Sequence, residues 1–289
     1  MTDRLPFRLM LVTSRQRSRG PLPELVAAAV AGGVDAIQVR EPHLEAAALT
    51  TLAMSLREVA GGRATILING DAGVAAALGL GLHLPERGMA TASGRRVIGE
   101  RALLGRSVHS AAAATAAAGA DYLLAGTLFA TASKPGVAPI GLSGLREIVA
   151  ASWEPVYAIG GIRAERVPEI LATGAVGVAV IGAIADADDP ERDAARLRRA
   201  IDRGTTEESM EPTTPSEAEE AVYVPIVVNG KPVEVEPDTS VTDFLADKGL
   251  QPAMVIVELN GTIIARRLYD ETFFTAGDHV EMVHAVGGG

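Results

Sequence analysis

Three glycines, Gly287, Gly288 and Gly289, stand at the C-terminus of this sequence, directly after an apolar run. Glycine has no Cβ, so such residues can lie extended in a narrow channel and present a terminal carboxylate to another protein's active site. A frayed or engineered end is the alternative, because termini are often disordered and rich in glycine. The strand-rich segment before the glycines favours a carboxylate that takes part in chemistry.

Two side chains suited to a small anionic substrate also follow apolar runs. Arg40 carries a guanidinium, which binds carboxylate and phosphate groups in a fixed geometry. His109 carries an imidazole, which both gives and takes a proton because its ordinary pKa lies near neutral pH. An exposed ion pair is the alternative for Arg40, and a structural role is the alternative for a lone histidine.

Small residues at two later points offer backbone N–H groups to a phosphate. Gly160 and Gly161 follow one apolar run, and Ile181 and Gly182 follow the next. Backbone N–H groups at a glycine turn or at the start of a helix bind phosphate. A tight turn explains each pair alone, but the two pairs together predict a phosphate site.

Composition narrows the class of protein. Of 289 residues, 48% are hydrophobic and 3% aromatic, so we expect a large, aliphatic core in more than one domain. Cysteine is absent, which excludes disulfides and thiolate metal sites. A net charge of −10 argues against nucleic-acid binding. With no signal peptide and no membrane-spanning run recognised, the cytoplasm is the expected location.

Residues 1–204 alternate strand-like and helix-like segments eight times, which predicts an α/β fold, the (β/α)₈ TIM barrel. A doubly wound open sheet is the alternative, but no Gly-x-Gly-x-x-Gly loop follows the first strand. Residues that follow barrel strands meet at one end, so Arg40, His109 and the glycine pairs are expected to share one site. Thr127 and Lys134, after the sixth strand, are predicted to contact the substrate there, with a solvated loop lysine as the alternative. The predicted strands lie near Phe7–Val12, Ala36–Val39, Thr65–Ile68, Leu80–His83, Ala102–Leu104, Tyr122–Leu124, Val156–Ala158 and Gly177–Val180.

Two further segments follow the barrel. Residues 205–221 are acidic, with prolines and no basic residue, which is typical of a flexible linker. Residues 222–289 have the pattern β-β-α-β-β. Asn229-Gly230 predicts the first hairpin, and Ser240 or Thr239 is expected to cap the helix.

The C-terminal segment resembles ThiS, the sulfur carrier of thiamine thiazole synthesis and a ubiquitin-like β-grasp protein. The resemblance rests on VNGKPVEVEPDTSVTDFL and on VIVELNGTIIARRLYDETFFTAGDHVEMVHAVGGG. It implies that a ThiF-like partner uses ATP to adenylate the carboxylate of Gly289. It also implies that Gly288 and Gly289 form a thiocarboxylate terminus, which delivers sulfur to thiazole synthase. The molybdopterin-synthase carrier, which has the same fold and ending, is the alternative.

The barrel resembles the thiamine phosphate synthase superfamily through QVRE, ILING, GRSVHS, DYLLAGTLFATASKPG, YAIGGI and GVAVIGAI. Two activities occur in that superfamily. The synthase joins a pyrimidine pyrophosphate to thiazole phosphate and needs magnesium. In this sequence Gly70 replaces its metal-binding aspartate, Leu84–Arg87 replaces its Gly-Gln-Glu-Asp stretch, and Pro42 replaces a lysine. Asp71 and Glu86 could substitute as metal ligands, but they are more simply a helix-start and a loop carboxylate.

At these positions the sequence resembles the motifs of the thiazole tautomerase TenI, the enzyme with the second activity. That resemblance implies proton transfer on a thiazole phosphate carboxylate, without a metal or other cofactor, with His109 as acid and base and Arg40 facing the substrate. It also implies that phosphate is held by Gly160, Gly161, Ile181 and Gly182.

We therefore predict an isomerase fused to a sulfur carrier in thiamine biosynthesis. One alternative is a divergent thiamine phosphate synthase fused to the same carrier, a transferase that would use magnesium. The other is an idle barrel that docks the carrier on thiazole synthase. No nucleic-acid or membrane partner is expected, and a homo-oligomer is left open.

Overall fold

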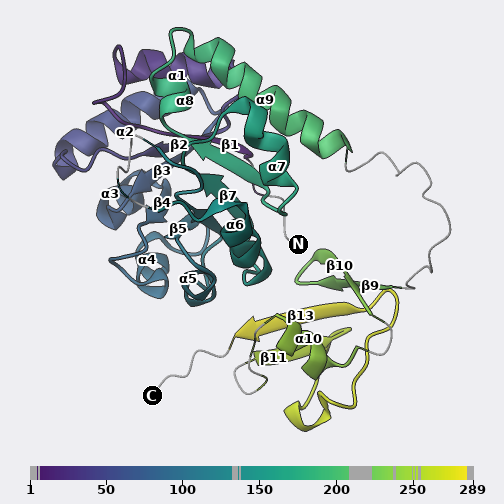
Figure 1. The fold of residues 1–289 in the computed structure, drawn as a ribbon. Helices are drawn as coiled ribbons and strands as arrows, with labels where there is room; N and C mark the ends of the chain where they lie inside the picture. Colours follow the sequence, from purple (N-terminus) through teal and green to yellow (C-terminus); the bar gives the residue numbers. More distant parts are fainter. Residues whose placement is uncertain are drawn as a thin grey trace, which may run out of the picture. The chain divides into compact units, whose positions relative to one another are not determined.

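Figure 1 shows the fold in a computed structural model, which describes residues 5, 7–131, 136, 138–207, 223–236, 239–248, 250, 252 and 255–284. The described residues divide into two compact units, 5–207 and 223–284, and each is described by itself. The linker expected at 205–221 lies outside the described residues from 208 onward. The last helix of the first unit, α9 (Pro190–Glu207), continues past the boundary expected at 204.

Eight parallel strands of the first unit close into a barrel in chain order, because β1 pairs with β8 as well as with β2. Helices follow the strands and cover the outside of the barrel (Figure 1), so the predicted (β/α)₈ barrel is confirmed. Among the described residues, no helix has both the length and the apolar character needed to cross a membrane. The strands are β1 (Leu9–Val12), β2 (Ala36–Val39), β3 (Thr65–Asn69), β4 (Gly81–Leu84), β5 (Leu104–Val108), β6 (Tyr122–Ala125), β7 (Val156–Ile159) and β8 (Gly177–Val180). The other helices are α1 (Leu22–Ala31), α2 (Ala46–Ala60), α3 (Ala72–Leu78), α4 (Thr91–Ile98), α5 (Ala111–Ala116), α6 (Gly141–Ala150), η1 (Ala164–Arg166), α7 (Val167–Leu171) and α8 (Gly182–Ala185).

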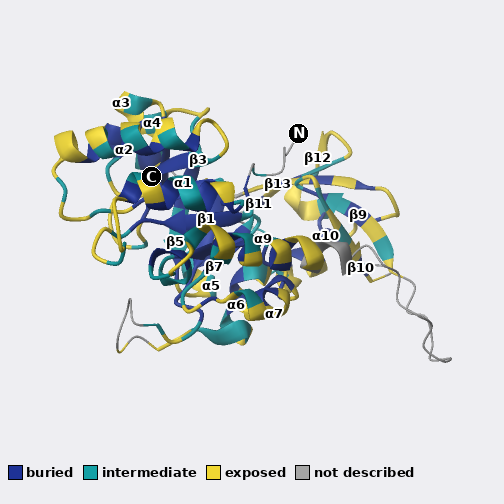
Figure 2. Ribbon diagram, turned by 90° about the horizontal axis from the view of Figure 1, so that it is seen from above, coloured by how far each residue is buried: buried dark blue, intermediate teal, exposed yellow. Residues whose placement is uncertain are grey.

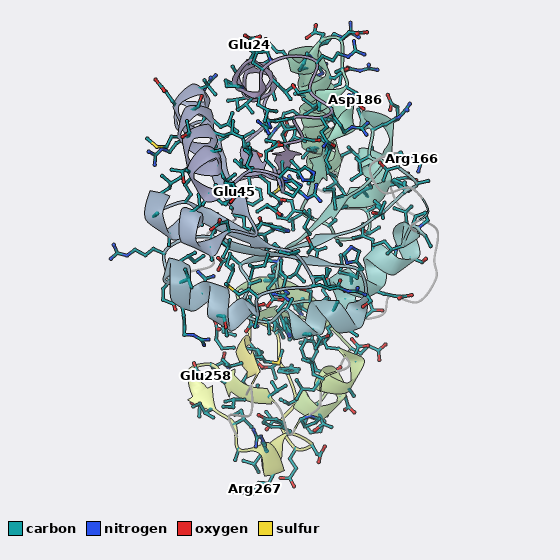
Figure 3. The ribbon with its side chains drawn as sticks, turned by 90° about the vertical axis from the view of Figure 1, so that its left-hand side faces the viewer. Glu24, Glu45, Arg166, Asp186, Glu258 and Arg267 are labelled. Carbon is teal, nitrogen blue, oxygen red and sulfur yellow. The ribbon has the colours of Figure 1, made fainter. Side chains whose placement is uncertain are left out.

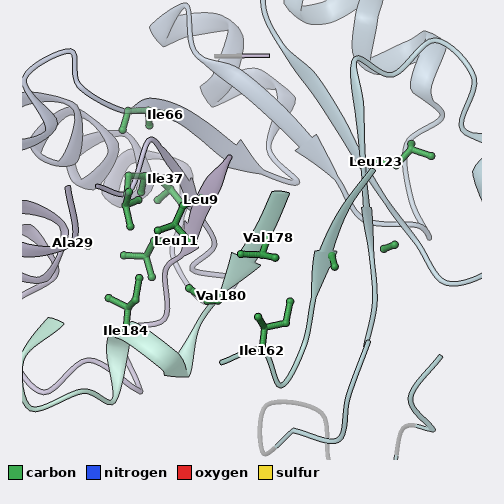
Figure 4. Packing of buried hydrophobic residues seen from close by; sticks show 14 of the residues in the cluster. Leu9, Leu11, Ala29, Ile37, Ile66, Leu123, Ile162, Val178, Val180 and Ile184 are labelled. Atoms are coloured by element: carbon green, nitrogen blue, oxygen red, sulfur yellow. The ribbon is translucent and has the colours of Figure 1, made fainter. Parts of the chain in front are cut away.

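The layer between strands and helices is aliphatic, as expected from the composition. Leu9 and Leu11 of β1 and Val178 of β8 belong to one buried cluster with Ala29 of α1 and Ile184 of α8 (Figure 4). Figure 2 shows the same division, with buried residues on the strands and exposed residues on the outer faces of the helices. Burial of this layer holds the helices against the barrel.

The interior of the barrel differs from the expected aliphatic core. Phe7, Tyr122 and Tyr157 are buried there, with ring centroids 5.4 Å (Phe7–Tyr122), 4.9 Å (Phe7–Tyr157) and 5.6 Å (Tyr122–Tyr157) apart. Three of the chain's ten aromatic residues thus lie where large side chains are needed to fill a closed ring of strands.

Strand β5 is the clearest difference from the predicted strands, because it spans Leu104–Val108 rather than Ala102–Leu104. Its second half carries the polar residues Arg106 and Ser107, which hide the apolar pattern of a strand. Both side chains form hydrogen bonds near the carboxyl ends of the strands. Arg106 and Ser107 interrupt the apolar pattern of this strand because their side chains take part in the site described below.

The second unit is a mixed sheet in the order β10-β9-β13-β11-β12, with β13 parallel to β9 and antiparallel to β11. The hairpin predicted at Asn229-Gly230 is confirmed, with φ of 47° and 76° at the two residues. Ser240 caps α10 in a capping box with Asp243, so Ser240 rather than Thr239 begins the helix. This is the predicted β-grasp arrangement. Its elements are β9 (Val224–Val228), β10 (Lys231–Val235), α10 (Val241–Asp247), β11 (Val255–Leu259), β12 (Thr262–Ile263), η3 (Arg266–Leu268) and β13 (His279–His284).

Candidate active site

A cavity of about 790 Å³ lies at the carboxyl ends of the barrel strands. The structure brings seven of the predicted site residues together in its lining, from the ends of β2, β5, β6, β7 and β8. They are Arg40, His109, Thr127, Gly160, Gly161, Ile181 and Gly182. Lys134, Gly288 and Gly289 lie outside the described residues.

The turn after β7 requires glycine at both Gly160 and Gly161. Their φ angles are 111° and 65°, in a region that other residues rarely adopt. A Cβ on Gly160 would lie 2.7 Å from Cγ2 of Thr127, and one on Gly161 would lie 2.7 Å from the carbonyl oxygen of Ala130. Next to this turn, α8 begins at Gly182, and its first backbone N–H groups have no acceptor within the helix. This side of the cavity therefore offers backbone donors to an anion.

Arginines surround the same side of the cavity. Arg17, from the loop after β1, donates from Nε to Oδ1 of Asp186 at 3.0 Å. Asp186, which is labelled in Figure 3, directly follows α8 in the sequence. Arg163 and Arg196 also line the cavity. Arg17 and Arg196 pair with carboxylates of the same lining, so the charge of Arg163 is what adds to the attraction that the backbone donors exert on an anion.

His109 and Glu86 form a pair on the other side of the cavity. Nδ1 of His109 lies 2.5 Å from Oε2 of Glu86, and both side chains are partly exposed, at 39% and 34%. Glu86 was predicted to be a loop carboxylate, and its contact with His109 was not predicted from the sequence. Leu84 pairs with Arg106 in the β4–β5 ladder, so residues just after these neighbouring strands meet. That register is the signal that could have found the pair.

Arg106 holds the loop that carries Glu86. Its guanidinium donates to the carbonyl oxygens of Glu86 at 2.9 Å and Met89 at 2.7 Å. The contact is with the backbone, so it fixes the loop without competing for the Glu86 carboxylate. Arg106 thereby positions Glu86 against His109.

Arg40 is fixed through its backbone, because its N–H donates to Oγ1 of Thr13 at 3.0 Å. Thr13 in turn donates to Glu41 at 2.9 Å, and Glu41 forms an ion pair with Arg15 at 3.6 Å. The exposed ion pair considered for Arg40 is thus made by its neighbour Glu41. In the described part of the chain, no ion pair involves the Arg40 guanidinium, which lines the cavity.

Polar side chains that the sequence analysis did not assign lie deeper. Nδ2 of Asn69 donates to Oε1 of Gln38 at 3.0 Å, and both residues line the cavity. His83 is buried and lies 2.8 Å from Oγ of Ser107 through Nε2 and 3.1 Å from the Tyr122 hydroxyl through Nδ1. Burial and the nearby charge of Arg106 lower the pKa of His83 to about 3. His83 is therefore neutral at the pH of the cell.

The carboxylates of the cavity do not fit a magnesium site. Each of the four that line it already has a partner: Glu86 with His109, Asp186 with Arg17, and both Glu165 and Asp193 with Arg196. Asp71 is not in the lining and accepts the N–H of Val74 at 2.9 Å as the cap of α3, the helix-start role expected for it. Within the described ranges, no group of three histidine, aspartate or glutamate residues could hold a metal ion.

Comparison with known proteins separates the two activities considered for the barrel. Residues 9–184 match the thiamine monophosphate synthase family, and residues 226–289 match the ThiS family. The thiamine-phosphate synthase of Mycobacterium sp. (strain JLS) is 40% identical over 210 residues, which cover 67% of this chain and 92% of that protein. The thiamine-phosphate synthase of Thermobifida fusca is 36% identical over 200 residues, with 67% and 92% covered. A solved structure, the thiamine phosphate pyrophosphorylase of Pyrococcus furiosus, is 32% identical, with a TM-score of 0.63 and 69% and 97% of the two chains covered.

These relatives contradict the prediction of an isomerase. That prediction rested on three short departures, at Gly70, at Leu84–Arg87 and at Pro42, whereas the similarity to transferases extends over the whole barrel. The chain belongs to the thiamine monophosphate synthase family and joins a barrel of that family to a ThiS family domain, a fusion of two components of thiamine biosynthesis.

Proposed function

We propose that the barrel is a thiamine phosphate synthase, a transferase that joins a pyrimidine pyrophosphate to thiazole phosphate. The observation that carries this proposal is a cavity with anion-binding groups in two sectors of the barrel. The backbone donors of Gly161 and Gly182 follow β7 and β8, and Arg17 and Arg40 follow the adjacent β1 and β2, so these groups share one sector. His109 follows β5 and lies in the other sector. Both substrates of the synthase carry phosphate groups, so a cavity for two anions suits them.

The chemistry of this transfer explains why cations matter more than a base. The bond between the pyrimidine methylene carbon and the diphosphate oxygen breaks, and the diphosphate leaves with the electron pair. The carbon bonds to the ring nitrogen of the thiazole, which has no proton to lose. Charge on the departing diphosphate is therefore what the site has to stabilise. We assign Arg40 to that charge and His109, held by Glu86, to ligand binding.

The test is turnover by the full chain with both substrates, with and without added magnesium, and with thiamine phosphate measured by chromatography. We expect product, and we expect Arg40→Gln to lower kcat/KM about 10- to 100-fold, the value of a hydrogen bond to a charged group. Arg101→Gln is the matched control, because Arg101 is exposed and precedes β5 at the opposite end of the barrel. Absence of product in both mixtures would contradict the proposal and favour the idle barrel.

For the second unit, we infer a sulfur carrier whose terminus is Gly288-Gly289. The match of residues 226–289 to the ThiS family supports this, as does the β-grasp sheet. A ThiF-like enzyme would adenylate the Gly289 carboxylate with ATP, sulfur would displace the adenylate, and thiazole synthase would take up the sulfur.

Mass spectrometry of the intact protein tests the carrier. After incubation with the adenylating enzyme, ATP and a sulfur donor, one oxygen of the C-terminal carboxylate should be replaced by sulfur. A chain that lacks Gly288-Gly289 should stay unmodified and keep its synthase activity. Modification of the shortened chain would place the sulfur elsewhere and reject the assignment.

A further inference from the structure

A row of three side chains leads from the barrel interior to the cavity, and the transfer reaction described above uses none of them. Tyr122 and His83 are fully buried, and Ser107 lines the cavity. The Tyr122 hydroxyl lies 3.1 Å from Nδ1 of His83, and Nε2 of His83 lies 2.8 Å from Oγ of Ser107. The row therefore joins the floor of aromatic rings to a hydroxyl that a ligand can reach.

Counting donors and acceptors fixes the direction of these hydrogen bonds. A neutral imidazole carries one N–H and one acceptor nitrogen. In the described part of the chain, the Tyr122 hydroxyl has no other hydrogen-bond partner, so its proton can be satisfied only by Nδ1 of His83. With Nδ1 as the acceptor, Nε2 carries the proton and donates to Ser107. The Ser107 oxygen then accepts inside the protein, and its own O–H is left for the cavity.

The opposite direction is costly. If Nδ1 carried the proton, it would donate to Tyr122, and the buried Tyr122 O–H would have no acceptor among the described residues. A buried polar group without a partner costs about 1–3 kcal/mol. An imidazolium with protons on both nitrogens is not formed at neutral pH either, because burial and the charge of Arg106 lower the pKa of His83 to about 3.

The packing of Tyr122 keeps the row in place. Its ring contacts Phe7 and Tyr157 in edge-to-face arrangements. Gly105 makes room for it, since a Cβ at that position would lie 2.0 Å from Cζ of Tyr122. The hydroxyl is thus held by the core of the barrel rather than by a flexible loop.

We propose that Tyr122 and His83 are positioning residues that fix Ser107 as a hydrogen-bond donor to an acceptor atom of the ligand. That a ligand with phosphate groups and a pyrimidine ring occupies the cavity rests on the proposed function. The donor direction does not, because it follows from the protein's own hydrogen bonds. The acceptor is a diphosphate oxygen or an unprotonated pyrimidine nitrogen, the two kinds of acceptor that such a ligand offers to a hydroxyl.

The tautomer of His83 can be observed in the ligand-free full chain. Long-range ¹H–¹⁵N correlation spectra at pH 7 distinguish a histidine protonated on Nε2 from one protonated on Nδ1. The chain has five histidines, and the His83 signals are assigned as those absent from the spectrum of His83→Gln. We expect the Nε2–H form, and a dominant Nδ1–H form would overturn the proposal. If the variant does not fold, backbone assignment of the unaltered chain identifies the same signals.

Binding measurements identify the acceptor, with inorganic pyrophosphate and the pyrimidine alcohol that lacks the diphosphate as separate probes. We expect Ser107→Ala to weaken one of the two affinities about tenfold, and Ser107→Thr, which keeps the hydroxyl, to restore it. His83→Leu should match the alanine variant, whereas His83→Gln, with an amide donor, should retain affinity. Ser110→Ala is the control, because Ser110 caps α5 outside the cavity lining.

Loss of the pyrophosphate affinity assigns the donor to the diphosphate, and loss of the alcohol affinity assigns it to the ring. Unchanged affinity for both probes overturns the proposal. A chain that makes no thiamine phosphate but contains the Nε2–H tautomer would contradict the proposed function alone.

Discussion

At the scale of single residues, the cavity depends on side chains held by other side chains. His109 is held by Glu86, whose loop is held by Arg106 through backbone carbonyls. Ser107 is held by His83 and Tyr122 in the same way. In both sets, the side chain that lines the cavity, His109 or Ser107, is held by a different side chain. The lining residue and the residue that holds it can therefore be altered independently.

Two variants of Glu86 separate the orientation of His109 from its charge environment. Glu86→Gln keeps an oxygen that accepts from Nδ1 of His109, whereas Glu86→Ala removes it. We expect Glu86→Ala to raise KM for the pyrimidine pyrophosphate about tenfold and Glu86→Gln to raise it less than about threefold. Arg106 should keep the loop in place in both, because it binds the backbone. Equal losses in the two variants would show that charge, not orientation, is required.

His83 makes the stability of the barrel depend on pH. Its pKa falls from 6.5 to about 3 on folding, so below pH 6.5 the unfolded chain takes up a proton that the folded barrel does not. Titration of His83 therefore leaves the free energy of unfolding unchanged above pH 6.5. Between pH 6.5 and pH 3 that free energy falls with acid, by up to roughly 1.4 kcal/mol per pH unit. Fluorescence of Trp153, the single tryptophan, follows denaturant unfolding of the barrel. His83→Gln should show a shallower loss of stability with acid, and equal slopes would contradict this account.

At the scale of elements, the turn after β7 combines a special backbone angle with a lack of space. Gly161→Ala would strain a φ of 65° and place Cβ 2.7 Å from the Ala130 oxygen. Gly62→Ala is the matched control, because Gly62 has a φ of 75° and nothing within 4 Å of such a Cβ. Both changes should cost about 1 kcal/mol of stability from the backbone angle. We assign the backbone donors of this turn to the phosphate of the thiazole, so only Gly161→Ala should also raise KM for thiazole phosphate, by about tenfold. An effect of similar size in Gly62→Ala would reject that assignment.

The elements themselves were largely predictable from the sequence, because apolar runs followed by helix-like segments determine a barrel. The exception, β5, contains Arg106 and Ser107, whose polar side chains serve the site rather than the core. That Gly160, Gly161 and Gly182 line one cavity was also predictable, since strand ends of a barrel meet. The Glu86–His109 pair and the row through His83 were not predicted, because both depend on the register of neighbouring strands, which decides which residues lie side by side.

The short motifs misled where the whole chain did not. Gly70, the stretch Leu84–Arg87 and Pro42 suggested loss of metal-dependent transfer, and the carboxylates of the cavity are held by partners within the protein. Yet the relatives that share the barrel are named as synthases. The altered positions are confined to three short stretches, whereas the similarity to proteins named as synthases extends over the whole barrel.

At the scale of the whole molecule, the barrel closes within residues 5–207, because β1 and β8 pair directly. We therefore expect the synthase activity to need nothing from the second unit. A specific protease site introduced between residues 208 and 222 would test this in the intact chain. After cleavage, kcat and KM should stay within about twofold of their starting values, with uncleaved protein as the control. A large loss on cleavage would mean that the two units work together.

The central position of β13 has a mechanical consequence for the second unit. The strand is hydrogen-bonded on both sides, from Val280 to His284 with β11 and at His279 and Val280 with β9. A force on the chain beyond His284 acts along this strand, so it loads many hydrogen bonds in shear at once instead of peeling them off singly. A pull at the end of β13 is therefore resisted by both neighbouring strands of the sheet at once.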